Sequence, residues 1–318
     1  GQETTGPAGF AKALRTIPVV LDICADIEKY APEAWLINFT NPAGMVTEAV
    51  LKHSRVKAIG LCNVPIGIKM KVAKDYGVGH ESVDLDYVGL NHLSWVRRVY
   101  VNGVDKSKEV LAKANRAKPN NIPELNVSPK FREALGMSPN WYLSYFYLND
   151  EMVAHLKTQG KTRAEVVAEL EEGLLEHYGD VNLYEKPQEL AKRGGAHYST
   201  AAISLVKDIH LNTGARHIVN VRNNGTLPEL PEDAVIEASS VVSAMGAMPL
   251  TVGKLEPEIR GLIQQVKCYE ELTIEAAVSG DYNKALLALS ANPLVHSVNK
   301  AQRLLDRFVE RHGLELGR

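Results

Sequence analysis

The chain has 318 residues, of which 45% are apolar and 23% are charged, values typical of a soluble globular enzyme and not of a disordered or fibrous chain. Its 36 basic and 38 acidic residues give a formal net charge of −2, and the basic residues are scattered, which argues against a nucleic-acid partner. No apolar run approaches the roughly 20 residues that a membrane span needs, and no signal peptide opens the chain. We therefore expect a cytoplasmic protein without a membrane partner.

The first part of the chain alternates helices with short apolar strands. After an opening loop at residues 1–7, the periodicity predicts, in chain order, a helix at 10–30, a strand at 34–39, a helix at 44–53, a strand at 56–61 and a helix at 65–76. This order is typical of an α/β fold with a parallel sheet covered on both faces. We interpret residues 1–82 as the latter part of a Rossmann-like, doubly wound domain that the chain enters in mid-fold.

The remainder, residues 83–318, has a different pattern. Residues 83–101 alternate apolar and polar side chains and end in an Asn-Gly hairpin signal, whereas residues 115–140 predict a long irregular segment. Thr162 opens a helix through a capping box. Further elements are expected as helices at 201–211, 258–278, 282–289 and 297–311 and as strands at 216–221 and 234–242. We expect a larger α+β domain that binds substrate and mediates oligomerisation.

Of the three cysteines, Cys62 stands where a reactive thiol is expected. Cys24 and Cys268 fall in helical apolar patterns and are predicted to be buried. Cys62 follows a strand and precedes a helix N-terminus, which favours the thiolate. His92, in a Gly-Leu-Asn-His segment, is a candidate to join Cys62 on a divalent ion and to leave positions open for substrate. The alternative is a buried cysteine and a hydrogen-bonded core histidine with no shared role.

Both predicted strands of the first domain end in polar clusters. Asn38 and Asn41 follow the first strand and Asn63 follows the second, and each cluster closes on a proline that leads into a helix. Ligands of open α/β sheets bind beyond the carboxyl ends of strands, and helix N-termini favour anions. The clusters therefore suit a phosphate or pyrophosphate, although Asn41 and Asn63 would also serve as simple helix caps.

Two further motifs carry groups suited to chemistry. Two glycines precede Tyr198 at a predicted helix start, a spacing that lets backbone approach a ligand and makes the phenol a candidate base. Arg222 ends a predicted strand among asparagines and is suited to a bidentate grip on phosphate. A helix capped by Ser199 and a turn built on Asn-Gly would explain the same residues without chemistry.

Taken together, these motifs resemble the NAD- and Mn²⁺-dependent family 4 glycoside hydrolases. They stand in the family's order along essentially the whole chain, and they are most similar to those of bacterial 6-phospho-β-glucosidases. The segments are Gln2-Glu3-Thr4-Thr5-Gly6-Pro7, Asn38-Phe39-Thr40-Asn41-Pro42, Gly60-Leu61-Cys62-Asn63-Val64-Pro65, Gly89-Leu90-Asn91-His92, Gly194-Gly195-Ala196-His197-Tyr198-Ser199 and Asn223-Asn224-Gly225.

The resemblance implies NAD and Mn²⁺ as cofactors and a phosphorylated disaccharide such as cellobiose 6-phosphate as substrate. Cys62 and His92 would hold the metal, and Tyr198 would be the base that removes the proton at C2. In the implied reaction, oxidation at C3 by NAD⁺ acidifies that proton, the aglycone leaves C1, water adds, and the hydride returns.

The resemblance also implies which residues bind substrate and cofactor. Asn41 and Asn63 would contact the substrate, and Arg222 would bind its 6-phosphate. Asn38 and Glu3 would contact the dinucleotide. Because related α-acting enzymes carry an aspartate at the position of Asn63, where it can protonate the leaving oxygen, the asparagine favours β-glucosides.

The sequence is also compatible with other functions. Within the family, the chain could act on α-glucosides, galactosides or galacturonides. Outside it, the alternatives are a metal-assisted NAD dehydrogenase of the malate type and a non-catalytic assembly module. The resemblance further implies a homodimer or homotetramer, and an upstream βαβ segment of roughly 100 residues. Without that segment we expect the chain to hydrolyse nothing at a useful rate.

Overall fold

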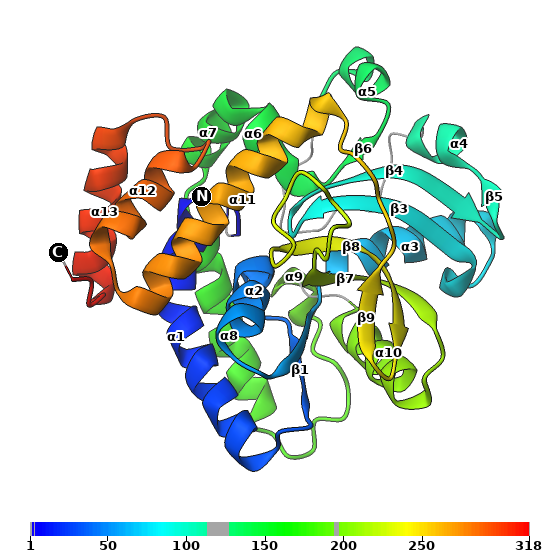
Figure 1. Ribbon diagram of the computed structural model, residues 1–318, viewed down its shortest axis with the longest axis horizontal. Coiled ribbons are helices and arrows are strands. Elements are labelled where there is room, and N and C mark those ends of the chain that lie inside the picture. Colours follow the sequence, from blue (N-terminus) through cyan, green and yellow to red (C-terminus); the bar gives the residue numbers. More distant parts are fainter. Residues whose placement is uncertain (1, 3, 113–126, 194–196, 318) are drawn as a thin grey trace.

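The computed structural model describes residues 2, 4–112, 127–193 and 197–317, which form two β-sheets with helices packed around them (Figure 1). The helices are α1 (Pro7–Tyr30), α2 (Ala43–His53), α3 (Asn63–Tyr76), α4 (Ser107–Ala112), α5 (Pro129–Leu135), α6 (Ser144–Tyr147), α7 (Asn149–Thr158), α8 (Arg163–Tyr178), α9 (Leu190–Arg193), α10 (Tyr198–Leu211), α11 (Pro257–Ser279), α12 (Tyr282–Ala291) and α13 (Val298–His312), with short 3-10 turns η1 (His80–Ser82) and η2 (Trp141–Leu143). The strands are β1 (Trp35–Asn38), β2 (Lys57–Gly60), β3 (Val83–Leu90), β4 (Leu93–Val101), β5 (Val104–Asp105), β6 (Ser138–Pro139), β7 (Ala215–Arg222), β8 (Val235–Ser243) and β9 (Gly246–Pro249).

The larger sheet has the strand order β1-β2-β7-β8-β9. β1 and β2 run parallel and are joined by α2, as expected, but β7, β8 and β9 each run antiparallel to the strand before them in the sheet. The expected parallel sheet is therefore a mixed one. Because β7 pairs with β2, the segments 1–82 and 83–318 share this sheet.

Alternation along β7 separates an apolar face from a polar one. Val219 and Val221 pack with Leu205 of α10 in one buried cluster. The intervening Asn220 faces the other way, because successive side chains of a strand alternate, and its Oδ1 lies 3.9 Å from where a Cβ on Gly44 would stand. The polar face of β7 therefore meets the N-terminal end of α2. The main hydrophobic core is built from α1, α2, α11, α12 and α13.

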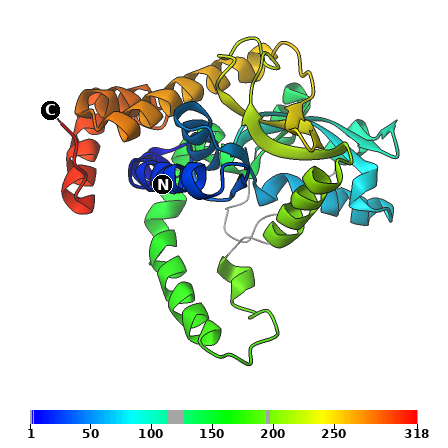
Figure 2. The same ribbon diagram turned by 60° about the horizontal axis from the view of Figure 1, so that its bottom comes forward.

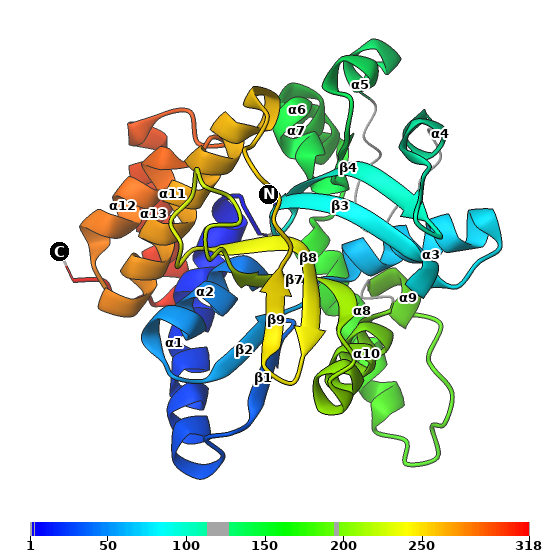
Figure 3. The ribbon, with the colours of Figure 1, turned by 45° about the vertical axis from the view of Figure 1, so that its right-hand side comes forward.

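The second sheet is centred on the β3–β4 hairpin, which lies beside β8 (Figure 3). Leu90 pairs with Leu93, so Asn91 and His92 form a two-residue turn that the sequence pattern did not predict. The predicted Asn102-Gly103 turn is present between β4 and β5, and both of its residues have positive φ, as such hairpin turns require.

Other expectations need smaller corrections. Residues 115–126 of the expected irregular segment lie outside the described residues, but α5 and β6 follow within 127–140, and α6 and α7 were missed. The capping box of Thr162 and Glu165 is confirmed at the start of α8, which projects away from the rest of the molecule (Figure 2). Cys24 is buried as predicted, whereas Cys268 is exposed. No helix within the described ranges is long and apolar enough to cross a membrane.

Candidate active site

The thiol of Cys62 and the imidazole of His92 meet in the protein interior. The Sγ atom lies 3.4 Å from Nε2, and both side chains are buried. A metal bound at about 2.3 Å by sulfur and about 2.1 Å by nitrogen holds those two atoms about 3.1–3.6 Å apart for ligand angles of about 90–110°. The pair therefore has the spacing of two ligands of one divalent ion. Within the described part of the chain, no group of three His, Cys, Asp or Glu side chains is placed to hold a metal ion.

Local backbone geometry explains why these two residues meet. Cys62 is the N-cap of α3, directly after β2, and its sulfur accepts a hydrogen bond of 3.5 Å from the amide of Val64. His92 stands in the β3–β4 turn with φ of 63°, a left-handed conformation that residues other than glycine adopt rarely. Gly89 permits this turn, because a Cβ there would lie 2.3 Å from the carbonyl oxygen of Leu93.

The N-terminal segment fixes the orientation of the His92 ring. Thr4 Oγ1 lies 2.7 Å from Nδ1, and the ring stacks on Tyr142 with centroids 3.8 Å apart. Thr4 is itself held by Gln2, whose Oε1 accepts a hydrogen bond of 2.6 Å from the Thr4 amide. When Nδ1 donates its hydrogen to Thr4, Nε2 presents its lone pair to a metal beside Cys62. The sequence alone assigned no such role to Gln2 or Thr4, although both belong to the first of the family motifs named above, residues 2–7.

The expectation of a free thiolate at Cys62 is wrong for the metal-free protein. Burial, reinforced by the negative charge of Glu237, raises the pKa of the Cys62 thiol far above its ordinary value. Hydrogen bonds from the amides of Val64 and Asn63 and from Asn91 act in the opposite direction but do not outweigh burial. A helix N-terminus is too weak to offset the desolvation of an anion in this interior. Metal binding at such a thiol must displace its proton.

A buried carboxylate that sequence reasoning missed lies behind the β3–β4 turn. Glu237 Oε1 accepts hydrogen bonds from Asn91 Nδ2 at 2.8 Å and from Asn220 Nδ2 at 3.3 Å. Its Oε2 accepts one of 3.1 Å from the hydroxyl of Tyr87, and the side chain is fully buried. An acidic residue inside an apolar strand was the available signal, because a buried charge needs such partners.

Glu237→Gln is expected to stabilise the metal-free protein increasingly as pH rises. Burial raises the pKa of Glu237 to about 7, against 4.5 for an ordinary glutamate, although its hydrogen bonds oppose the shift. Below pH 4.5 the carboxyl is protonated in both states and costs nothing, whereas above pH 7 the folded protein is penalised by about 3 kcal/mol. Melting temperatures from pH 4.5 to 8 should show a growing advantage for the variant. An advantage that does not change over this range would contradict the prediction.

Asn38 closes the loop that leads from β1 to α2. Its Oδ1 accepts a hydrogen bond from the amide of Thr40 at 2.9 Å, and its Nδ2 donates to the carbonyl of Ala43 and to Thr47 Oγ1 at 3.3 and 3.2 Å. Both hydrogens of the Asn38 amide are thus engaged inside the loop. Its predicted contact with the dinucleotide stays a prediction.

Asn41 and Asn63 lie at the carboxyl ends of β1 and β2, where the sequence placed them. Asn41 precedes a cis peptide bond to Pro42, and Asn63 is the first residue of α3; both are partly exposed. Neither asparagine is the helix cap, since Pro42 and Cys62 occupy the cap positions. Both side chains are therefore available to a ligand at the strand ends. Glu3 lies outside the described residues.

The structure does not place Arg222 beside the other predicted site residues, and its predicted contact with phosphate stays a prediction. β7 runs antiparallel to β2. The last residue of β7 therefore lies near the start of β2, whereas Cys62 follows the end of β2. Nη2 of Arg222 donates a hydrogen bond of 2.6 Å to the carbonyl oxygen of Leu51, near the C-terminal end of α2. Arg222 therefore stabilises the negative end of a helix.

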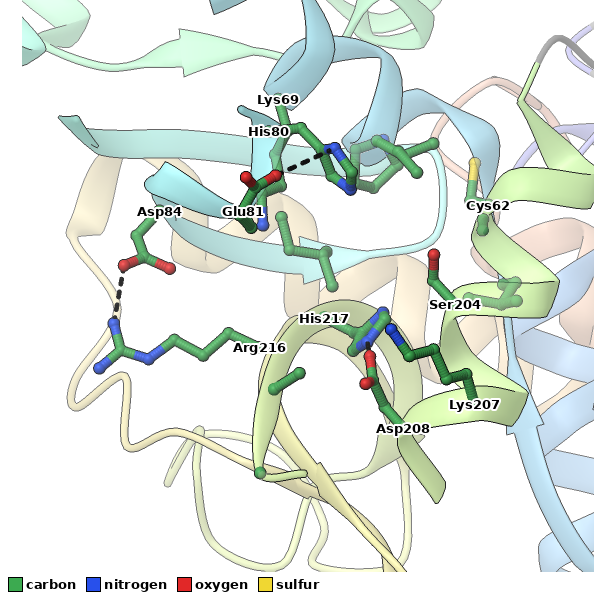
Figure 4. A pocket seen from close by; sticks show the side chains of 17 residues that line it. Cys62, Lys69, His80, Glu81, Asp84, Ser204, Lys207, Asp208, Arg216 and His217 are labelled. Atoms are coloured by element: carbon green, nitrogen blue, oxygen red, sulfur yellow. Dashed lines mark hydrogen bonds and ion pairs between the residues drawn. The ribbon is translucent and has the colours of Figure 1, made fainter. Parts of the chain in front are cut away.

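Tyr198 is the first residue of α10 and packs edge-on against Phe39, which follows β1, with ring centroids 4.9 Å apart. Ala201 and Ser204 follow it on the same face of the helix, at intervals of three residues. These two residues line a cavity that Cys62 also lines (Figure 4). Tyr198 therefore lies on the same face of α10 as the two residues that line the cavity, one turn nearer to the start of the helix.

The cavity has a volume of about 620 Å³ and is bounded by α3, α10 and the start of β7. Figure 4 shows three polar contacts in its wall: the ion pair Arg216–Asp84 at 2.9 Å and the histidine–carboxylate contacts His217–Asp208 at 2.7 Å and His80–Glu81 at 3.5 Å. Lys69 and Lys207 also line it, and neither forms an ion pair with a described residue. Burial lowers the pKa of Lys69, and the carboxylates of Asp84 and Glu81 oppose this shift without outweighing it. The cavity can therefore offer two ammonium groups to an anion.

Comparisons with known proteins agree with this arrangement. A family model described as family 4 glycosyl hydrolase matches residues 1–78, and a model of the family 4 glycosyl hydrolase C-terminal domain matches residues 87–295. The chain is 46% identical over 321 residues to a probable 6-phospho-beta-glucosidase of Bacillus subtilis (strain 168) and 40% identical over 326 residues to a 6-phospho-beta-glucosidase of Escherichia coli (strain K12); each alignment covers 98% of this chain and 72% of the relative. The structure of the 6-phospho-beta glucosidase from Thermotoga maritima with manganese, NAD+ and glucose-6-phosphate matches with a TM-score of 0.90 at 38% identity, covering 100% of this chain and 76% of that chain. The chain belongs to family 4 of the glycosyl hydrolases.

Proposed function

We propose that this chain supplies the metal ligands and substrate contacts of an enzyme that hydrolyses 6-phospho-β-glucosides by the NAD-assisted mechanism of its family. Relatives that are 40–46% identical carry that activity in their names, and the Cys62–His92 pair at the end of β2 is the observation in this chain that supports it. Cys62 Sγ and His92 Nε2 are the ligands for Mn²⁺, because their spacing fits a single ion. When bound, NAD and Mn²⁺ supply hydride transfer at C3 and polarisation of the C3 oxygen.

The chain's own residues bind, orient and move a proton. Thr4 keeps Nε2 of His92 directed at the metal position. Tyr198 removes the C2 proton, and Asn41 and Asn63 contact the sugar from the strand ends. Asn38 acts on the cofactor through the loop that it closes. Because the amide of Asn63 has no acid proton to donate, a leaving group that departs after C2 deprotonation suits this site.

The phosphate of the substrate belongs, in this proposal, to the cavity beside Cys62. Lys69 and Lys207 are the cations in its wall without a paired carboxylate. Phosphate oxygens accept charge-assisted hydrogen bonds from such groups. These two lysines are proposed as phosphate ligands in preference to Arg222, because Arg222 is engaged at the far end of α2.

Tyr198→Phe tests the assignment of the base. The ring and its contact with Phe39 are kept while the hydroxyl is lost, so folding and metal binding should survive and C2 deprotonation should slow by roughly 10²–10⁴-fold. The assay follows deuterium incorporation at C2 of the product in heavy water, with active enzyme. If the Phe variant incorporates deuterium as fast as the parent, Tyr198 is only a helix-start residue.

Lys207→Met and Lys69→Met test the phosphate site. Loss of one charged hydrogen bond, about 1.5–3 kcal/mol, should raise KM for p-nitrophenyl 6-phospho-β-glucoside roughly 10- to 100-fold. Lys157→Met, on the exposed face of α7 and outside the cavity wall, is the matched control and should leave KM unchanged. If KM is unchanged in both cavity variants, the phosphate does not bind to these two lysines.

Two expectations about the whole protein stay predictions. One is the homodimer or homotetramer. The other is that these 318 residues alone, which span about 72% of the length of the relatives named above, hydrolyse nothing at a useful rate. NAD⁺-dependent cleavage of p-nitrophenyl 6-phospho-β-glucoside by the chain as given would contradict the second.

A further inference from the structure

A single residue, Asn91, lies between Glu237 and the two candidate metal ligands. Oε1 of Glu237 accepts the hydrogen bond of 2.8 Å from Asn91, the residue that precedes His92 in the β3–β4 turn. The same Asn91 side chain also forms a hydrogen bond with Cys62. A single amide therefore links the carboxylate of Glu237 to the sulfur of one ligand and to the backbone of the other.

The turn that carries His92 needs this support. His92 has a left-handed backbone, and Oδ1 of Asn91 has no hydrogen-bond partner among the described residues. The bond from Nδ2 to Glu237 therefore helps to fix the orientation of the Asn91 amide. A non-glycine residue in this conformation persists only where the surrounding structure holds it.

Glu237 is well suited to be the fixed point, because side chains from two other strands hold its carboxylate. Asn220 of β7 donates to Oε1 at 3.3 Å, and Tyr87 of β3 donates to Oε2 at 3.1 Å. Asn140 and Ser94 extend this network, with 3.1 Å between Asn140 Nδ2 and Ser94 Oγ. The carboxylate has little freedom to follow a displaced turn.

We propose that Glu237 is a positioning residue of the metal centre: through Asn91 it holds the β3–β4 turn so that His92 Nε2 faces the sulfur of Cys62. This inference rests on the proposed metal site. Groups behind a metal's ligands typically change metal affinity 10- to 100-fold when they are removed. The effect expected here is a loss of Mn²⁺ affinity of that size.

The experiment measures the Kd of Mn²⁺ for four variants and the parent by electron paramagnetic resonance of the free ion. Glu237→Ala and Asn91→Leu should each raise Kd about 10- to 100-fold. Glu237→Gln, which keeps an oxygen able to accept from Asn91, should recover most of the affinity. Tyr87→Phe removes one of the hydrogen bonds that hold the carboxylate but leaves the link between Glu237 and Asn91 in place, so it should raise Kd by less than Asn91→Leu does.

A second readout separates positioning from general damage to the fold. The charge-transfer band of a Co²⁺–thiolate bond reports directly on the sulfur ligand, and it should weaken in Glu237→Ala and return in Glu237→Gln. Glu237→Ala combined with Asn91→Leu should weaken Mn²⁺ binding no further than either change alone, since both break the same link.

The possible outcomes distinguish this inference from the function on which it rests. If the parent binds no Mn²⁺, both the proposed metal site and the proposed positioning role of Glu237 are wrong. If the parent binds Mn²⁺ and Asn91→Leu binds it equally well, only the positioning role is wrong, and the same holds if Tyr87→Phe weakens binding as much as Asn91→Leu. Should Glu237→Ala fail to fold, Asn91→Leu and Glu237→Gln decide the question by the same criteria.

Discussion

Replacing Cys62 with serine is expected to abolish tight Mn²⁺ retention and to lower kcat/KM for 6-phospho-β-glucosides roughly 10³-fold. A neutral hydroxyl replaces a thiolate, which is the stronger ligand of this pair. Loss of the metal then removes about 4 kcal/mol of transition-state stabilisation, at about 1.36 kcal/mol for each tenfold change in rate. Metal analysis after gel filtration measures retention, and p-nitrophenyl 6-phospho-β-glucoside measures kcat/KM in active enzyme.

Cys268→Ser is the matched control for this change. Cys268 lies exposed on α11, away from the β2–α3 junction, so the same chemical substitution there should alter neither metal retention nor rate. A Cys62→Ser protein that keeps both Mn²⁺ and activity would remove the sulfur from the metal site.

Lys267→Met should destabilise the fold by about 3–5 kcal/mol, because among the described residues it leaves Glu270 buried without a cation and Glu48 with Lys52 alone. Nζ of Lys267 lies 2.7 Å from Glu48 Oε2 and 2.7 Å from Glu270 Oε2, and all three side chains are at most 1% exposed. Burial alone would lower the pKa of Lys267, but the two carboxylates outweigh it and raise that pKa above its ordinary value. Nζ also donates to the carbonyl of Val235, so one ammonium group joins α2, α11 and β8. Denaturant unfolding of the metal-free protein measures the loss.

Removing the charges together gives the control for the buried lysine. Lys267→Met combined with Glu48→Gln and Glu270→Gln leaves no unpaired buried charge, so it should recover a large part of the lost stability. A single Lys267→Met variant that unfolds at the same denaturant concentration as the parent would show that the ion pairs contribute nothing.

The helices were the most predictable part of the fold, because their signals are local. Thr162 and Glu165 mark the start of α8 by a capping box, and the apolar spacing of 258–278 marks α11. Cys268 was placed in the core of α11 in error. It precedes the buried Tyr269 by one position, and two neighbouring positions of a helix point in directions about 100° apart.

The direction of the strands was not predictable in the same way. A strand pattern has the same appearance whichever way the strand enters the sheet, so the end of β7 was taken for a ligand-binding edge. Its antiparallel pairing with β2 puts Arg222 beside Leu51 instead. Conversely, β1 and β2 are joined by α2, a connection that fixes them as parallel, and the strand-end residues Asn41 and Asn63 lie where they were expected.

For Cys62 and His92, the sequence motifs predicted which side chains meet but not their protonation. Cys62 and His92 were selected from their places at a strand end and in a polar break, and the structure brings their ligand atoms within 3.4 Å. The protonation of the thiol was misjudged because burial, which depends on tertiary packing, outweighs the helix end. Glu237 was missed for the same reason, since its partners come from strands far apart in the sequence.

Hydrolysis in heavy water tests the central claim most directly. Active enzyme with NAD⁺ and Mn²⁺ is given a 6-phospho-β-glucoside in D₂O, and the released sugar phosphate is examined by nuclear magnetic resonance while NADH is followed by absorbance. Because the proposed route breaks the C2–H bond and returns the hydride to C3, we predict deuterium at C2 of the product and no accumulation of NADH. Product that keeps its hydrogen at C2 would contradict the elimination route, and NADH formed in proportion to product would make the protein a dehydrogenase.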